Sequence, residues 1–230
     1  MRSLPNAVSF KRRLLKWYRR FGRRLPWRAT RNPYRVLVSE FMLQQTQVSR
    51  VAQYYPRFLG RSPPIQDLAH ARPGAVREAW DGLGYYRRAS NLHRLAQVVV
   101  KSHGGRVPDD ERSLEELPGV GPYTAAAVAS FAYQQRRLPV DTNVARVLRR
   151  AFGLRGDGAR GRRRLSRIAS DLLPRRGAVA WEFNQAMMDL GATVCRARRP
   201  DCPQCPVRPA CVTGSKLVRG ATAPIPRRER

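Results

Sequence analysis

The feature that most constrains the fold is a glycine turn between two helical segments. The string LEELPGVGPYTAAA starts at Leu114, and its middle predicts a tight turn made of Leu117, Pro118, Gly119, Val120 and Gly121. Two glycines one residue apart allow positive φ and close approach of another backbone, and Val120 is expected to plug the turn against a core. Exposed amides at the start of the second helix would suit a phosphate. The sequence therefore predicts a helical hairpin that can contact a polyanion.

Helical patterns continue on both sides of this hairpin, and strand-like alternation is nowhere convincing. Asn32 and Pro33 read as the N-cap and first position of a long helix over 34–59. Other helices are predicted over 11–24, 66–81, 86–103, 111–116, 122–134, 141–152, 162–173 and 178–192. The fold class is therefore all-α.

The charge balance points to a polyanionic partner. The 230 residues include 45 Lys and Arg against 16 Asp and Glu, a formal net charge of +29. Charge alone does not separate DNA, RNA and an acidic membrane surface. A basic ribosomal-type protein would usually be shorter and less apolar than this chain, which is 42% hydrophobic.

The chain has neither a run of apolar residues long enough for a membrane span nor an N-terminal segment typical of a secretory signal. We therefore expect a cytoplasmic, nucleoid-associated protein without a membrane partner. In a reducing compartment, cysteines that cluster in sequence indicate a metal site more often than two disulfides.

Four cysteines form such a cluster, with the spacing C-x6-C-x2-C-x5-C: Cys195, Cys202, Cys205 and Cys211. Four thiolates this close suit either tetrahedral zinc or a 4Fe–4S cluster, and spacing alone does not decide between them. The three histidines lie far away in sequence, so they offer no mixed zinc site.

Two carboxylates stand in contrasting sequence environments. Asp141 precedes the helical string starting at Val144, where it would serve as an N-cap, and amides there favour its ionised form. Such a fixed negative charge can stabilise a developing sugar cation. Glu40 lies among apolar residues, and burial would favour its protonated form, which a general acid needs. Without other information, Asp141 would only cap and Glu40 would only face solvent.

The strings around these residues resemble those of one family. SEFMLQQTQV contains Glu40, and LPWR at 25–28, WDGLGYYRRASNLH at 80–93, FNQAMMDLGA at 183–192, the hairpin LPGVGPYTA and the cysteine array also match. Together they cover roughly residues 25–212. They resemble the MutY-type adenine DNA glycosylases, within the helix-hairpin-helix superfamily that includes endonuclease III.

The resemblance implies a role for each matching residue. Glu40 would protonate adenine, Asp141 would stabilise the sugar cation, and Tyr123 and Asn143 would support Asp141. The glutamine side chains in the segment 44–47 can bond base edges or fill a gap in the duplex. By resemblance, Gln45 would insert into the duplex, and Tyr85 would wedge beside the opposite base. Arg28 and Gln185 would help to recognise adenine. The cysteines would hold a 4Fe–4S cluster.

The family fold also implies two helical lobes. A six-helix lobe with the hairpin would span 27–136, and an iron–sulfur lobe would combine 1–26 with 137–214, leaving a basic tail at 215–230. The expected partner is double-stranded DNA containing a mismatch or lesion, bound by a monomer. Related enzymes often carry a further C-terminal domain that reads 8-oxoguanine, and we expect this chain to be a short form without it.

One position bears on the reaction type. Lyase-active relatives carry a lysine where this chain has Tyr123, and no lysine lies between Lys101 and Lys216. The resemblance therefore implies a monofunctional glycosylase that removes adenine paired with 8-oxoguanine or guanine. A thymine or uracil glycosylase acting on T:G or U:G mismatches is the alternative, and a DNA-binding module without catalysis is a third possibility.

Overall fold

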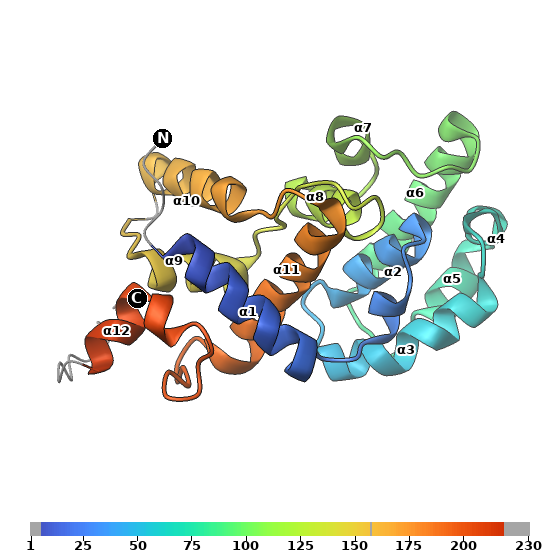
Figure 1. Cartoon of the computed structure of the whole chain (residues 1–230). Coiled ribbons are helices and arrows are strands. Elements are labelled where there is room, and N and C mark those ends of the chain that lie inside the picture. Colours follow the sequence, from blue (N-terminus) through green and yellow to red (C-terminus); the bar gives the residue numbers. More distant parts are fainter. Residues whose placement is uncertain (1–5, 157, 219–230) are drawn as a thin grey trace. The chain divides into compact units, whose positions relative to one another are not determined.

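The computed structural model describes residues 6–156 and 158–218, and these residues contain helices and no strands (Figure 1). They form two compact units. The hairpin unit consists of residues 23–139 and 175–181. The cysteine unit consists of the described residues in 6–22, 140–174 and 182–218. The all-α prediction is confirmed for the described part of the chain.

The hairpin unit is built around an almost wholly apolar helix, α8 (Pro122–Phe131), whose residues are mostly buried. Helix α8 contacts α2 (Pro33–Leu43) and α7 (Glu111–Glu115). The remaining elements are η1 (Pro26–Ala29), α3 (Val48–Arg61), α4 (Ile65–His70), α5 (Pro73–Ala79) and α6 (Arg87–His103). Because α2 and α8 share one core, the hairpin and the segment carrying Glu40 are packed together.

The helix predicted over 34–59 is two helices, with a break at residues 44–47. The predicted N-cap at its start is confirmed, since the Arg35 amide donates to the Asn32 side chain. A second split, between α4 and α5, divides the helix predicted over 66–81 at Ala71 and Arg72, just before Pro73. With these two splits, the five helices that the sequence pattern predicts within 27–136 become the seven α-helices α2 to α8.

The cysteine unit contains α1 (Ala7–Phe21), α9 (Thr142–Phe152), α10 (Ala159–Leu172), the second part of α11 (Gly177–Asp189), a π-helical turn (Leu190–Val194), a 3-10 turn (Arg208–Ala210) and α12 (Val212–Val218). The rings of Phe10 and Phe152 pack at a centroid distance of 5.4 Å, which joins α1 to α9. Helix α12 includes the first residues of the predicted basic tail, and residues 219–230 lie outside the described part.

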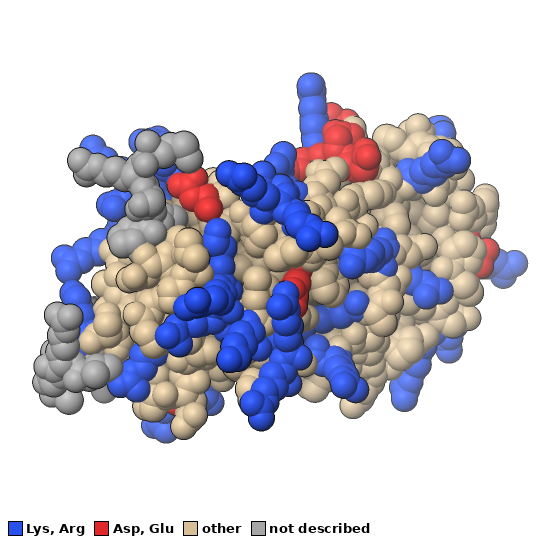
Figure 2. All heavy atoms as spheres, viewed as in Figure 1, with Lys and Arg blue, Asp and Glu red and all other residues tan. Residues whose placement is uncertain are grey.

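Among the charged side chains on the visible surface, basic ones far outnumber acidic ones (Figure 2). Figure 2 shows Lys and Arg over the face that carries α1, whereas acidic side chains gather around α7. No helix in the described part of the chain has the length and apolar character needed to cross a membrane. A surface of this kind suits a polyanion.

Candidate functional site

Glu40 lies inside the hairpin unit, in the most buried stretch of α2. Its residue exposure is 6%, and its neighbours Ser39 and Phe41 are at 1% and 0%. The helix is buried on nearly every side from Tyr34 to Met42, which explains why its sequence shows no polar stripe. The structure thus excludes the solvent-facing alternative for this carboxyl group.

The QQTQ string forms the break after α2. Gln45 is exposed and adopts φ 56°, a left-handed conformation rare for residues other than glycine. A second turn, Gly82 to Tyr85, precedes α6, and Tyr85 there has φ 48° and is 62% exposed. The two side chains with predicted insertion roles therefore stand on strained turns and reach solvent.

The hairpin turn differs at its two glycines. Gly119 has φ +79°, and a Cβ there would lie 2.9 Å from Asn91 and 3.0 Å from Phe41, so only glycine fits. Gly121 is the extended N-cap of α8, and a Cβ there would meet nothing within 4 Å. The prediction of a positive φ is therefore confirmed for Gly119 and wrong for Gly121. Leu117 and Val120 are buried, as predicted for a plugged turn.

Asp141 caps α9 in the cysteine unit. The Val144 amide donates to its Oδ1 at 2.6 Å, and the Asn143 side-chain amide donates to its Oδ2 at 2.9 Å. Arg146 donates to the Asn143 side chain at 2.8 Å and to the Cys195 carbonyl at 2.9 Å. The half-buried carboxylate is therefore oriented by two donors, and a hydrogen-bonded series continues to the first cysteine.

All four cysteines line one cavity of about 640 Å³ in the cysteine unit. They are half-buried, and none of them forms a disulfide. Burial raises the pKa of Cys202 and Cys211, and that of Cys205 to about 12. Thiols in such a setting keep their protons unless a cation displaces them.

The cavity has the chemistry of a thiolate-ligated site. Arg150 lies on its wall, where it donates to the Arg196 carbonyl at 2.8 Å and contacts Cys195 Sγ at 3.5 Å. Within the described residues, no three Cys, His, Asp or Glu side chains are arranged to hold a metal ion. Four thiols around a cavity of this size, with a neighbouring cation to offset thiolate charge, nevertheless fit a polynuclear cluster.

The remaining predicted residues occupy different surroundings. Arg28, in η1, donates to the Arg23 carbonyl at 3.0 Å and is half-buried. Gln185, in α11, is buried at 5% exposure. Tyr123, the second residue of α8, is half-buried in the hairpin unit. Gln44 is half-buried beside the exposed Gln45.

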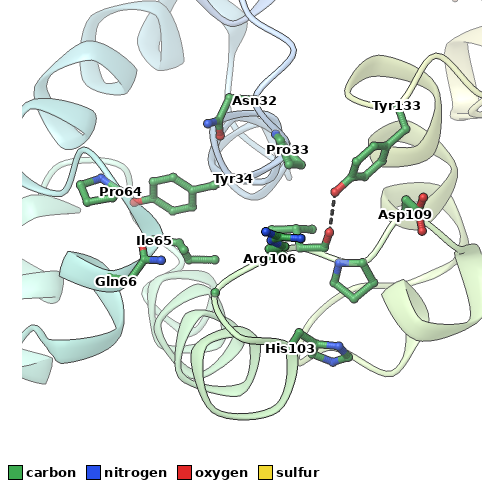
Figure 3. Close-up of a pocket in the computed structure, with 13 residues that line it drawn as sticks. Asn32, Pro33, Tyr34, Pro64, Ile65, Gln66, His103, Arg106, Asp109 and Tyr133 are labelled. Carbon is green, nitrogen blue, oxygen red and sulfur yellow. Dashed lines mark hydrogen bonds between the residues drawn. The ribbon is translucent and has the colours of Figure 1, made fainter.

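The hairpin unit also contains a cavity of about 660 Å³ that includes none of the predicted site residues (Figure 3). Tyr34 and Tyr133 lie on its wall, and their hydroxyls donate to the carbonyls of Ser62 and Val107. Burial raises the pKa of Tyr133 to about 12. Since both hydroxyls have backbone partners, the tyrosines act as structural residues of this wall.

Sequence reasoning missed three arginines that, within each unit, bond the segments carrying predicted site residues. Arg88 bonds the turns that carry Gln45 and Tyr85, while Arg146 and Arg150 bond the cysteine loop. Buried arginines usually have carbonyl or carboxylate partners. In a chain with so many arginines, that burial leaves no signal in the sequence.

Comparisons with known proteins agree with this geometry. Residues 38–174 match the family described as HhH-GPD superfamily base excision DNA repair protein. The adenine DNA glycosylase of Mycobacterium tuberculosis is 50% identical over 198 residues, 84% of this chain. The thymine-DNA glycosylase of Aeropyrum pernix is 37% identical, over 89% of this chain and 93% of its own length.

Solved structures show the same fold. A thermostable thymine-DNA glycosylase superposes with a TM-score of 0.84 and 32% identity, covering 92% of this chain and 97% of its own. An endonuclease III–DNA complex superposes with a TM-score of 0.79 and 24% identity, covering 95% and 100%. The chain spans only 64% of the Mycobacterium tuberculosis relative's length.

Proposed function

Since the chain belongs to the HhH-GPD superfamily of base excision DNA repair proteins, we propose that it is a DNA glycosylase that removes adenine paired with 8-oxoguanine or guanine. The main support is the buried Glu40, placed one turn before the exposed QQTQ break. The 50% identity to an adenine DNA glycosylase supports the choice of base.

In the proposed reaction, Glu40 donates its proton to the leaving base. The glycosidic bond breaks, and its electron pair leaves with the protonated base. Burial suits Glu40 to this role because desolvation disfavours the ionised carboxylate. The base must leave the stack to reach this side chain, as in other enzymes that act on bases.

Asp141 stabilises the positive charge that develops on the sugar. Its two donors, Val144 N and Asn143 Nδ2, fix the orientation of the carboxylate. Water then adds to the sugar carbon and gives up a proton, which leaves an abasic site. Since Tyr123 stands where lyase-active relatives have lysine, no covalent adduct forms, and borohydride should trap none.

Duplex DNA is the proposed substrate, bound by a monomer mainly through phosphates. The open N-terminus of α8 at Gly121 suits a backbone phosphate, and the basic surface strengthens binding. Gln45 inserts into the duplex, and Tyr85 wedges beside the opposite base. For such a DNA repair role, we expect a cytoplasmic location associated with the nucleoid.

Cys195, Cys202, Cys205 and Cys211 are the residues proposed to hold a 4Fe–4S cluster. When bound, the cluster would supply structural cross-linking or a redox-active centre rather than the base-removal chemistry. Iron and acid-labile sulfide in the anaerobically purified protein test this assignment. Colourless protein loaded with zinc would contradict it.

A thymine or uracil glycosylase is the second candidate, favoured by the likeness to the thermostable thymine-DNA glycosylase over nearly its whole length. The test is to incubate the protein with duplexes containing A:8-oxoguanine, A:G, T:G or U:G and to cleave abasic sites with alkali. Release of adenine is expected. Release only from T:G or U:G would establish the second candidate, and no release from any duplex would favour a DNA-binding module.

A further inference from the structure

Arg88, the second residue of α6, is buried at 7% exposure although its side chain ends in a charged guanidinium group. Its guanidinium donates to backbone carbonyls and one hydroxyl, and no carboxylate is among these partners in the described part of the chain. On the α2 side the acceptors are the carbonyls of Phe41 at 3.0 Å, Met42 at 2.8 Å and Gln44, together with Thr46 Oγ1 at 3.0 Å. These oxygens belong to the end of α2 and the break that follows it.

On the other side, the same guanidinium holds the turn before α6. It donates to the carbonyls of Leu83 at 3.3 Å, Gly84 at 3.1 Å and Tyr85 at 3.4 Å. One side chain therefore joins two turns about forty residues apart in sequence. A helix C-terminus leaves its last carbonyls without partners, and a cation that caps them also interacts favourably with the helix dipole.

The two turns joined by Arg88 carry Gln45 and Tyr85, the two residues that combine a left-handed backbone conformation with a predicted contact to DNA. Gln45 has φ 56° and Tyr85 has φ 48°, and such left-handed conformations persist only where surrounding structure determines them. Each lies next to an Arg88 acceptor or is one itself. Arg88 supplies the local interactions that can offset this strain.

Arg88 also contacts the Tyr85 ring directly. Its Cζ lies 5.4 Å from the centroid of Tyr85 and 5.4 Å from that of the buried Trp80. Trp80 in turn donates from Nε1 to the Gly84 carbonyl at 3.2 Å. The guanidinium thus supports the exposed ring by a cation–π contact as well as its backbone.

We propose that Arg88 is a positioning residue that holds Gln45 and Tyr85 ready for insertion into the duplex. Preformed turns lose less conformational entropy on binding DNA than turns that order at that step. This inference rests on the proposed function for the use of the two side chains, but the coupling of the turns is a property of the free protein.

Lysine cannot replace this arginine in the proposed role. A guanidinium presents five N–H donors in a planar fork, whereas an ammonium is a compact point charge with three donors. Arg88→Lys therefore keeps the charge but loses the bridge. The neighbouring Arg87 is exposed, so Arg87→Lys is a matched control one residue away.

The first experiment measures amide hydrogen exchange in the full-length free protein, with the melting temperature checking that each variant is folded. In Arg88→Lys, amides at 43–47 and 82–86 should exchange about tenfold faster, because buried carbonyls lose their donor. Amides of the hairpin turn, 117–121, and all amides of Arg87→Lys should exchange as in the unchanged protein. Unaltered exchange at both turns, or faster exchange throughout the chain, would overturn the proposal.

The second experiment measures single-turnover base release from the duplex that the unchanged protein cleaves. Arg88→Lys should lower the rate about tenfold and reduce the fluorescence rise of a 2-aminopurine placed beside the target base. In a Gln45→Ala/Tyr85→Ala background, the same substitution should lower the rate less than about twofold further, because its effect passes through those side chains.

A full tenfold loss in that background would assign Arg88 a general structural role and overturn the positioning role. If the unchanged protein releases no base from any duplex, the proposed function fails. The exchange experiment then decides the coupling of the two turns by itself, so the two failures are distinguishable.

Discussion

The two proposed catalytic carboxylates are held in opposite ways. Glu40 lies within an apolar helix at 6% exposure, and the hairpin packs beside it through Gly119 and Phe41. Asp141 is half-buried at a helix N-terminus, where Val144 N and Asn143 Nδ2 each donate to one of its oxygens. The hairpin unit thus controls its carboxyl group by excluding water, and the cysteine unit controls its own by hydrogen bonds.

This difference fits the two proposed roles. A site from which water is excluded fits a proton donor, whereas two hydrogen-bond donors that orient a carboxylate fit an electrostatic role. Pairs of carboxyl groups with such divergent environments are a recurring basis for acid and electrostatic roles in one enzyme. Substitutions that remove the charge of Glu40 or Asp141 but keep the size of the side chain test this division of roles.

Glu40→Gln should have the largest effect. The amide cannot protonate the base, so single-turnover release should fall by roughly 10²–10⁴, while duplex affinity stays unchanged. Rapid-quench kinetics and a binding titration measure the two quantities. Glu78→Gln, an exposed change in the same unit, is the matched control and should have no effect. Equal losses in release and in affinity would contradict the acid role.

Asp141→Asn should have the next largest effect. It keeps the size of the side chain but removes the negative charge, so release should fall by roughly 10²–10³. Asp171→Asn, exposed on α10, controls for a loss of charge in the same unit. A rate within twofold of the unchanged protein would leave Asp141 as a helix cap only, and the fall in melting temperature would then be its sole consequence.

Gly119→Ala should weaken the packing that encloses Glu40. At φ +79° and with Asn91 and Phe41 within 3.0 Å of a new Cβ, alanine should cost about 1–3 kcal/mol of unfolding free energy. Gly121→Ala, in open space, should change it by no more than about 0.5 kcal/mol. Denaturant titrations measure both. Equal effects at the two glycines would show that the hairpin does not depend on the close approach at Gly119.

Sequence periodicity predicted most helices because their apolar residues recur at helical spacing and their ends carry proline, glycine or capping residues. The Asp141 cap is confirmed for the same local reason. The break after Leu43 could not be predicted, since the QQTQ string contains no helix breaker. Its geometry depends on Arg88, which comes from a helix more than forty residues later.

The same limit applies to the site. The apolar neighbours make Glu40 unusual in sequence, but only the family resemblance implies its acid role, and its burial depends on tertiary packing by α8 and the hairpin. Arg87 and Arg88 are identical letters, and only the fold makes one exposed and the other buried. Residues that act through long-range packing are therefore visible only in the structure.

Asn143→Ala should have the smallest effect and sharpens the comparison most. It removes one of the two donors to Asp141 and the contact with Arg146, so release should fall about tenfold. Thr142→Ala, an exposed change next to it, should leave the rate unchanged. In an Asp141→Asn background, Asn143→Ala should add less than about twofold, because its effect passes through that carboxylate. An unchanged rate for Asn143→Ala alone would mean that the Val144 amide suffices to hold Asp141. The hydrogen bond from the Asn143 side chain would then not be what distinguishes the cysteine unit from the hairpin unit.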